Sequence, residues 1–179
     1  MTLAAANPSR HGIASNPALM AALAITLVAL ATLAGAWFFQ LVLDIRPCPL
    51  CLEQRYAYYL ALPLGALTAL LAARHAPRQW LMAAFVILLI AALGNAYLGG
   101  YHAGVEWQFW PGPTDCSGPL VDFGKAGNLL EQLDKVKVVR CDEVQFRFLG
   151  LSLAGYNVLI SLLMALIAAW GIAGTAKRS

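Results

Sequence analysis

Four cysteines are the residues of this chain whose types and spacing could do chemistry. Cys48 and Cys51 form a CxxC pair, whereas Cys116 and Cys141 lie far apart in one polar segment. A bridge within CxxC closes almost no loop, so it adds little stability by constraining the unfolded chain. Redox activity therefore explains that spacing better. The pair Cys116 and Cys141, taken alone, is more often a structural loop disulfide.

Zinc binding is the main alternative use of four cysteines. Structural zinc sites usually combine two close-spaced pairs, and the chain has one such pair. We therefore expect no metal and favour two disulfides, which the even count allows. Disulfides persist in exported compartments, whereas cytosolic cysteines of this kind more often bind metal.

The residues around the CxxC pair predict which thiol is the more acidic. Pro49 suits the first turn of a helix, because its missing N–H would be unpaired there. Cys48 is then the helix cap and Cys51 lies in the first turn, where unpaired N–H groups favour a thiolate. Arg55 follows one turn later on the same face. We predict that Cys51 is the more acidic thiol and that Cys51 and Arg55 flank one pocket.

Arg55 has two interpretations at the mouth of an apolar helix. Its long side chain could simply reach the membrane surface, where a guanidinium is hydrated. Alternatively, it donates hydrogen bonds to a thiolate or to a carbonyl oxygen of a bound ligand. Its spacing from Cys51 favours the second interpretation.

The composition indicates which elements position these residues. Hydrophobic residues make up 60% of the 179 and charged residues only 12%, with a mean hydropathy of +0.68, more apolar surface than a soluble domain can bury. We predict an all-α integral membrane protein, a four-transmembrane-helix bundle forming one membrane domain over residues 1–179. The first span exceeds the about 7 to 15 apolar residues of a cleavable signal peptide, so we expect it to be retained. The predicted spans are 18–39, 56–73, 80–98 and 149–172.

The charged residues predict the orientation. Basic residues without acids flank the first span, the second-to-third connection and the last span, so both termini are expected to be cytoplasmic. Residues 40–55 and 99–148 then form a short and a long external loop, which hold every cysteine and every acid. The net charge of +3 reflects this topology, and no basic cluster points to nucleic acid. The basic residues in question are Arg10, Arg74, Arg78, Lys177 and Arg178.

The second external loop is long and rich in Gly and Pro between residues 111 and 119. Such a loop suits a segment that moves to meet an outside partner. Between its cysteines, Leu129, Leu130, Leu133 and Val136 share one helical face, as in a helix that lies on a membrane surface. An equally good interpretation is a short helix that only covers the bundle.

Together these motifs resemble the disulfide bond formation protein B family, DsbB. The resemblance runs from about Ala18 to the end of the chain, through the four spans, the motif CPLCLEQR at the start of the second span and FLGL at residues 148–151. Few other protein families combine a CxxC followed by Gln-Arg at a span entrance with two further cysteines in the next external loop.

The resemblance implies a multi-pass protein-disulfide oxidoreductase of the bacterial cell inner membrane, with its cysteines on the periplasmic side. Such a protein reoxidises a DsbA-like periplasmic thiol oxidase and passes the electrons to a membrane quinone, ubiquinone or menaquinone. This sustains disulfide bond formation in exported proteins. The implied disulfides are Cys48–Cys51 and Cys116–Cys141.

The resemblance also assigns roles to single residues. Cys116 matches the cysteine that exchanges with the reduced partner, and Cys141 completes that loop pair. Cys51 matches the thiolate that contacts the quinone, and Cys48 its partner that exchanges with the loop pair. Arg55 matches the arginine beside the quinone.

His102 allows two interpretations. The resemblance matches it to a family histidine near the quinone, and its aromatic neighbours equally favour a place in a belt of interfacial aromatic residues. Tyr97, Tyr101, Trp107 and Trp110 surround it in the sequence.

Redox potentials also favour a quinone. A thioredoxin-like pair near about −270 mV would have to oxidise a DsbA-like partner near about −120 mV, which is roughly 7 kcal/mol uphill. A stronger lipid-soluble acceptor removes this obstacle. The chain has neither a Rossmann glycine pattern nor CxxCH, so flavin and haem lack a motif.

Two other classes of protein share parts of this pattern. A structural four-span protein of tetraspanin-like layout explains the topology but not a CxxC with an arginine one turn on. An enzyme similar to vitamin K epoxide reductase is also a quinone-linked bundle, but its CxxC is expected late in the bundle. Here the CxxC opens the second span.

Overall fold

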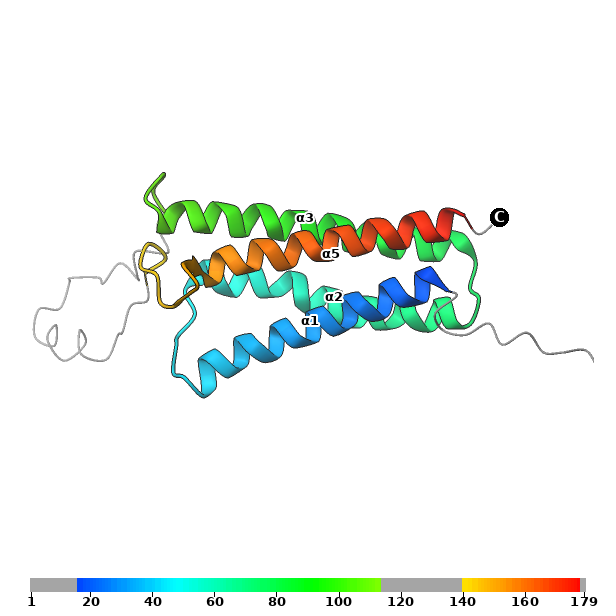
Figure 1. Ribbon diagram of the computed structural model, residues 1–179, viewed down its shortest axis with the longest axis horizontal. Helices are drawn as coiled ribbons and strands as arrows, with labels where there is room; N and C mark the ends of the chain where they lie inside the picture. Colours follow the sequence, from blue (N-terminus) through cyan, green and yellow to red (C-terminus); the bar gives the residue numbers. More distant parts are fainter. Residues whose placement is uncertain (1–15, 114–139, 178–179) are drawn as a thin grey trace, which may run out of the picture.

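The computed structural model of the protein describes residues 16–113 and 140–177. Within these residues it is a bundle of four helices (Figure 1), each long and apolar enough to cross a membrane. Cys116 and the apolar face predicted between Leu129 and Val136 lie outside the described residues. The helices are α1 (Pro17–Leu41), α2 (Pro49–Ala73), α3 (Arg78–Glu106) and α5 (Leu153–Ala176).

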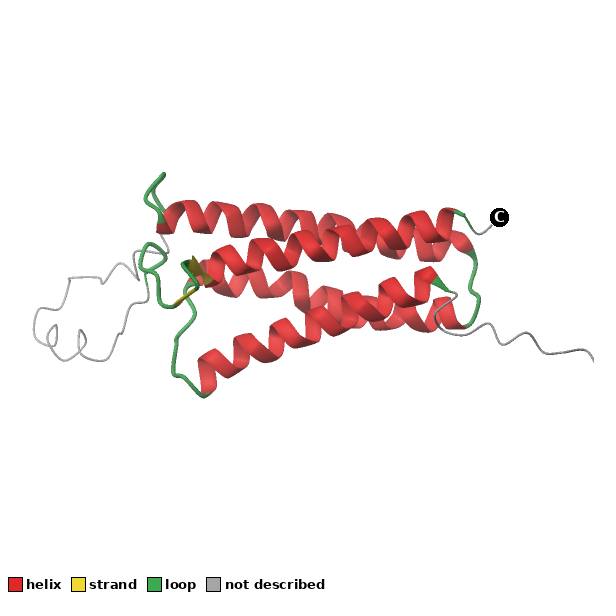
Figure 2. Ribbon diagram, in the orientation of Figure 1, coloured by secondary structure: helices red, strands yellow, loops and turns green. Residues whose placement is uncertain are grey.

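The predicted four-helix membrane bundle is confirmed. Helix α1 starts at the same end of the bundle as the last turn of α5, so the first and last described residues lie together (Figure 1). The other end holds the starts of α2 and α5 and the ends of α1 and α3. We call it the cysteine end, because Cys48 and Cys141 lie there. A pair of two-residue strands, β1 (Arg147–Phe148) and β2 (Leu151–Ser152), leads into α5 at this end (Figure 2).

Helix starts follow from local capping residues. The Asn16 side chain accepts a hydrogen bond from the Leu19 N–H at 3.1 Å, and Pro17 occupies the first turn, where its missing N–H is not needed. Ser152 caps α5 in the same way, accepting from the Gly155 N–H at 3.2 Å. Gly150, at φ +82°, supplies the left-handed turn between the two strands.

Helix α3 is longer than expected at the cysteine end. The long second loop was predicted to begin near residue 99, but α3 continues to Glu106. Gly99 does not end the helix because it packs closely against α5: a Cβ there would lie 2.9 Å from Nδ2 of Asn157. The additional turns carry His102 on a helix rather than on a loop, and this corrects the predicted loop boundary.

Four polar side chains meet between α2, α3 and α5, inside the apolar bundle. We call Tyr58, Asn95, Asn157 and Ser161 the polar cluster. The Tyr58 hydroxyl donates to Oδ1 of Asn157 at 2.6 Å, and Nδ2 of Asn95 donates to Oγ of Ser161 at 2.9 Å. Polar groups within spans commonly join helices in this way.

Residues 107–113 turn back against α3. The Trp110 ring stacks on Tyr101 with centroids 6.0 Å apart, and its Nε1–H donates to the Tyr101 carbonyl at 3.0 Å. The indole fills the space beside Gly104, where a Cβ would collide with it. Gly104 therefore allows the connection that leaves α3 to lie against the helix.

Candidate functional site

The site begins at the entrance of α2. Cys48 is the cap of this helix, with extended backbone angles and Pro49 in the first turn. Its Sγ accepts a hydrogen bond from the Cys51 N–H at 3.3 Å. The predicted cap and the predicted position of Cys51 in the first turn are therefore confirmed.

The two sulfurs of the CxxC pair are neighbours. Cys48 and Cys51 are free thiols here, with their Sγ atoms 2.8 Å apart and joined by a hydrogen bond. Cys48 is buried, with 2% of its surface exposed. The Cys48–Cys51 disulfide stays a prediction.

The donors around the pair converge on Cys48. The neighbouring Cys51 thiol, followed by His102 and the Cys51 N–H, overcomes the effect of burial and lowers the pKa of Cys48 from 9.0 to about 5. The prediction that Cys51 is the more acidic thiol is wrong for this arrangement. Cys48 is stabilised as a thiolate chiefly by the neighbouring Cys51 thiol, next by His102, and least by the Cys51 N–H that it receives as the helix cap.

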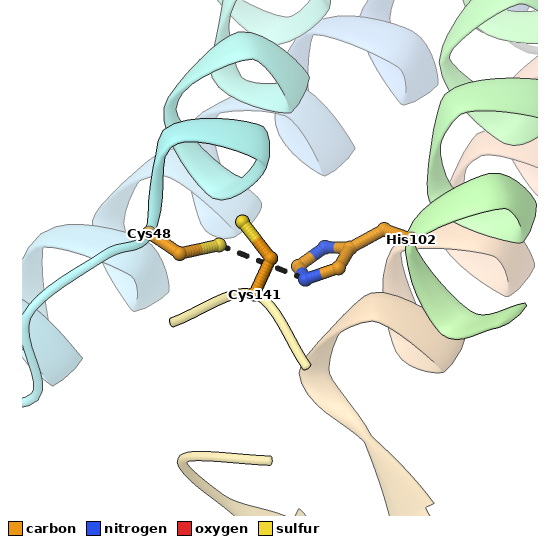
Figure 3. Close-up of side chains that lie close together, drawn as sticks. All are labelled: Cys48, His102 and Cys141. Carbon is orange, nitrogen blue, oxygen red and sulfur yellow. Dashed lines mark hydrogen bonds between the residues drawn. The ribbon is translucent and has the colours of Figure 1, made fainter. Parts of the chain in front are cut away.

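His102 lies against Cys48, as Figure 3 shows. Its Nε2 is 3.6 Å from Sγ of Cys48, and its Nδ1 is 2.9 Å from Nε2 of Gln54. His102 is 3% exposed, so the structure places it in the interior and not in an interfacial aromatic belt. Whether it also contacts a quinone stays a prediction.

Cys141 completes the group of side chains at this end of the bundle. It is 1% exposed, takes part in a disulfide, and lies across from Cys48 and His102 (Figure 3). Its sulfur, Sγ of Cys48 and a ring nitrogen of His102 all lie within 4.8 Å of one another. Such a trio could ligate a metal, but a sulfur held in a disulfide is not a thiolate ligand. We call Cys48, Cys51, Gln54, His102 and Cys141 the thiol cluster.

A large cavity adjoins the thiol cluster. Its volume is about 630 Å³, within the roughly 300 to 1,000 Å³ typical of ligand pockets. Of the two CxxC cysteines, Cys51 lines it. The predicted pocket flanked by Cys51 and Arg55 is therefore present. Its other walls come from α1, α3, α5 and the segments 45–47 and 145–148, and they include Ala36, Phe39, His102, Phe146, Asn157 and Ile160.

Arg55 is held on the wall of this cavity by α1. Its guanidinium donates to Oε1 of Gln40 at 2.7 Å and to the Ala36 carbonyl at 3.4 Å. The same group lies 5.6 Å from the ring centre of Trp37, a cation–π distance. Arg55 therefore braces α1 against α2, which neither interpretation of its sequence position anticipated.

Two residues of the site were not predicted to belong to it. Gln54 is 5% exposed and touches His102, and its signal was its position three residues after Cys51, on the same helical face. Glu106, the last residue of α3, has a buried Oε2 without a hydrogen-bond partner among the described residues. Glu106 was predicted to lie in a loop. The greater length of α3 shows that Glu106 lies one turn after His102 on the same helix.

A reduced CxxC pair at a helix entrance, next to a disulfide cysteine and inside a four-helix membrane bundle, defines a class: membrane-embedded thiol–disulfide oxidoreductases. Comparison with known proteins agrees with this class. Residues 18–171 match the family model of the disulfide bond formation protein DsbB. The chain belongs to the DsbB family.

Individual relatives support the same assignment. The chain is 32% identical over 159 residues to disulfide bond formation protein B 1 of Pseudomonas fluorescens, which covers 86% of this chain and 88% of the relative. It is 36% identical to disulfide bond formation protein B of Marinobacter nauticus, over 79% of this chain and 84% of the relative. The protein of that name from Nitrosococcus oceani is 31% identical, over 80% and 84%. The chain is thus a disulfide-forming oxidoreductase of a membrane.

Proposed function

We propose that this protein reoxidises a DsbA-like periplasmic dithiol protein and passes the electrons to a quinone in the bacterial inner membrane. One observation carries the proposal. The CxxC pair lies between a disulfide cysteine and an apolar cavity, with Cys48 beside Cys141 and Cys51 on the cavity wall. Cys48 therefore faces Cys141, from which the pair is proposed to receive electrons, and Cys51 faces the cavity in which the quinone is proposed to bind.

The distribution of charge supports the proposed orientation. The end of the bundle opposite the cysteines carries Arg74, Arg78 and Lys177. Among the described residues, that end has no acid, whereas the cysteine end has acids together with Arg46, Arg55, Arg140 and Arg147. Basic residues are retained on the cytoplasmic side of a membrane, so the cysteine end is proposed to face the periplasm.

The first exchange takes two electrons from the partner. A thiolate of the partner attacks Cys116 in the proposed Cys116–Cys141 disulfide, and Cys141 leaves as a thiolate. The second partner thiol, after losing its proton, attacks the first partner sulfur and releases Cys116. The partner leaves as a disulfide, and both loop cysteines are reduced.

The second exchange moves the electrons to the CxxC pair. The Cys141 thiolate attacks Cys48 of the Cys48–Cys51 disulfide, and Cys51 leaves as a thiolate. Cys116 then attacks Cys141, restores the loop disulfide and releases Cys48 as a thiolate. A sulfur whose pKa is lowered to about 5 is a good leaving group.

The cavity fits a quinone. Its wall is mostly apolar, as a ring with an isoprenoid tail requires, and Arg55 supplies a guanidinium that can donate to a ring carbonyl. Bound there, a quinone would accept the two electrons and two protons that leave when Cys48 and Cys51 form their disulfide. The chain's own contribution is to hold Cys51 on the cavity wall and Cys48 against its donors.

The deciding experiment is a turnover assay in detergent. The purified protein receives a reduced DsbA-like partner and a soluble quinone, and loss of quinone absorbance is followed for the unmodified chain and for Cys51→Ser. We expect turnover in the unmodified chain and none in Cys51→Ser. Arg78→Ala, at the opposite end of the bundle, is the control and should retain full turnover.

Two results would overturn the proposal. One is the absence of turnover in the unmodified chain with both ubiquinone and menaquinone analogues. The other is undiminished turnover in Cys51→Ser, which would remove the CxxC pair from the path of the electrons.

A further inference from the structure

Gln54 is a buried amide that the proposed electron path does not use. It lies on α2 one turn after Cys51 and is 5% exposed. Its Nε2 is 2.9 Å from Nδ1 of His102, and the imidazole also contacts Sγ of Cys48 at 3.6 Å and the backbone of Cys141. A buried amide in this position constrains which ring nitrogen of His102 carries a hydrogen.

The contact decides where the imidazole carries its hydrogen. A neutral imidazole has one N–H, so one ring nitrogen donates and the other accepts. An amide nitrogen only donates, so Nδ1 of His102 must be the accepting nitrogen. The hydrogen is then on Nε2, and Nε2 is the atom that lies 3.6 Å from Sγ of Cys48.

We propose that Gln54 is a positioning residue, which holds His102 in the tautomer with hydrogen on Nε2 so that this N–H points at the sulfur of Cys48. The sulfur then has two N–H groups aimed at it, one from His102 and one from the Cys51 backbone at 3.3 Å. Gln54 acts only through His102, because its amide contacts the ring from the side opposite Cys48. The functional benefit rests on the proposed function, in which Cys48 leaves as a thiolate.

An amide is suited to this role, and a carboxylate is not. An ionised carboxylate only accepts, so it would draw the hydrogen to Nδ1 and leave a lone pair on Nε2 facing the sulfur. A thiolate facing a lone pair is repelled, whereas a thiolate facing an N–H is stabilised. Gln54→Glu should therefore reverse the tautomer, although the two side chains have nearly the same shape.

Other titratable groups face the same site and must stay unchanged in any test. Cys51 on α2 and Cys141 on the returning loop contact Cys48, and Glu106 lies one turn beyond His102 on α3. Arg147, on β1, interacts electrostatically with Glu106. Substitutions at position 54 leave all four groups in place.

The direct test reads the tautomer by nitrogen-15 NMR of the histidine-labelled protein in detergent, at a pH where the ring is neutral. The protein has three histidines, so the His102 signals are identified by their loss in His102→Ala. We expect the hydrogen on Nε2 in the unmodified chain and on Nδ1 in Gln54→Glu. Hydrogen on Nδ1 in the unmodified chain would overturn the proposal. This reading requires neither partner nor quinone, so it succeeds or fails independently of the proposed function.

A second test asks whether Gln54 acts through His102. The pKa of Cys48 is read from the pH dependence of its alkylation rate in a Cys51→Ser background, with Gln54→Leu introduced alone and together with His102→Ala. Loss of one oriented hydrogen bond should raise this pKa, which slows alkylation at pH values below it about 3- to 10-fold when His102 is present. In the His102→Ala background Gln54→Leu should change nothing, since the ring it orients is gone.

A matched control separates this effect from a general disturbance. Gln79→Leu makes the same substitution at an exposed position of α3, at the opposite end of the bundle, and should leave alkylation unchanged. Equal slowing by Gln54→Leu with and without His102 would show that Gln54 affects Cys48 through packing and not through His102, and would refute the proposal.

Discussion

The bundle buries two groups of polar side chains, and they are built differently. The polar cluster joins α2, α3 and α5 through hydrogen bonds of 2.6 to 3.2 Å between oxygen and nitrogen atoms. The thiol cluster joins α2, α3 and the loop before α5 through weaker contacts to sulfur, such as the 3.6 Å from His102 to Cys48. The first lies inside the bundle, where Tyr58 and Asn157 also reach the cavity wall, and the second lies at the end of the bundle beside the same cavity.

This difference suggests that the polar cluster stabilises the fold and that the thiol cluster takes part in the reaction. In the polar cluster the hydroxyls and amides hydrogen-bond one another across helices, although Nδ2 of Asn157 has no partner among the described residues, so removal of these groups should weaken the bundle. In the thiol cluster, hydrogen-bond donors surround the sulfur of Cys48, whose disulfide bonds form and break in the proposed reaction. Substitutions there should alter chemistry while the helices stay assembled. The predictions below test this separation.

Cys48→Ser should have the largest effect. Serine is as good a helix cap as any residue, so the start of α2 should be preserved and the thermal midpoint should stay within a few degrees. Exchange with Cys141 requires a sulfur at position 48, so oxidation of the reduced partner should fall to background. Partner oxidation and thermal unfolding are measured on the same detergent sample. A large loss of thermal stability would contradict the separation.

Arg55→Ala should have the next largest effect. A hydrogen bond to a charged group contributes about 1.5 to 3 kcal/mol, so quinone use, measured as kcat/KM, should fall by roughly 10- to 100-fold. Both disulfides should still form. Arg55→Lys should recover only part of the loss, because an ammonium cannot reproduce the planar fork that reaches both Gln40 and Ala36. Unchanged kcat/KM for quinone would assign Arg55 to bracing α1 alone.

The pH dependence of stability should differ between the two redox forms. The pKa of Cys48 is about 5 in the folded reduced protein and near 9.0 for an ordinary thiol. The unfolded chain therefore holds this proton over a range where the folded protein has released it, so stability should rise as pH increases from 5 to 9. Below pH 5 this contribution is absent. Thermal midpoints at pH 5 and pH 8 should diverge for the reduced form more than for the form with a Cys48–Cys51 disulfide.

Ser161→Ala should have the smallest effect, and on stability alone. It removes the hydroxyl that meets both Tyr58 and Asn95, and hydrogen bonds between membrane helices contribute about 0.6 kcal/mol on average and up to about 1.7. Unfolding in mixed detergent should detect a loss in this range, with turnover unchanged. Lost turnover with unchanged stability would instead place the polar cluster in the chemistry.

The sequence was sufficient where local rules decide the structure. Four apolar runs predicted the four helices, and a proline after Cys48 predicted the cap and the first turn of α2. These features depend on a few neighbouring residues and on the thickness of a bilayer. The pocket between Cys51 and Arg55 also followed from helical spacing.

The sequence was insufficient where contacts between distant segments decide. The more acidic thiol was assigned to Cys51 because the helix N-terminus was considered without asking which sulfur its N–H groups reach. The position of His102 depended on α3 continuing past Gly99, which in turn depends on packing against α5. The contact between Gln54 and His102 joins residues 48 positions apart, and no local sequence pattern predicts it.

The fold-back of Trp110 onto Tyr101 beside Gly104 provides a built-in optical reporter. An indole that is stacked on a ring and hydrogen-bonded to a carbonyl emits light differently from one in water, so its fluorescence records whether residues 107–113 remain against α3. The chain has five tryptophans, and replacing the other four by phenylalanine would isolate this signal. The protein could then be followed during catalysis without attaching a dye to any cysteine.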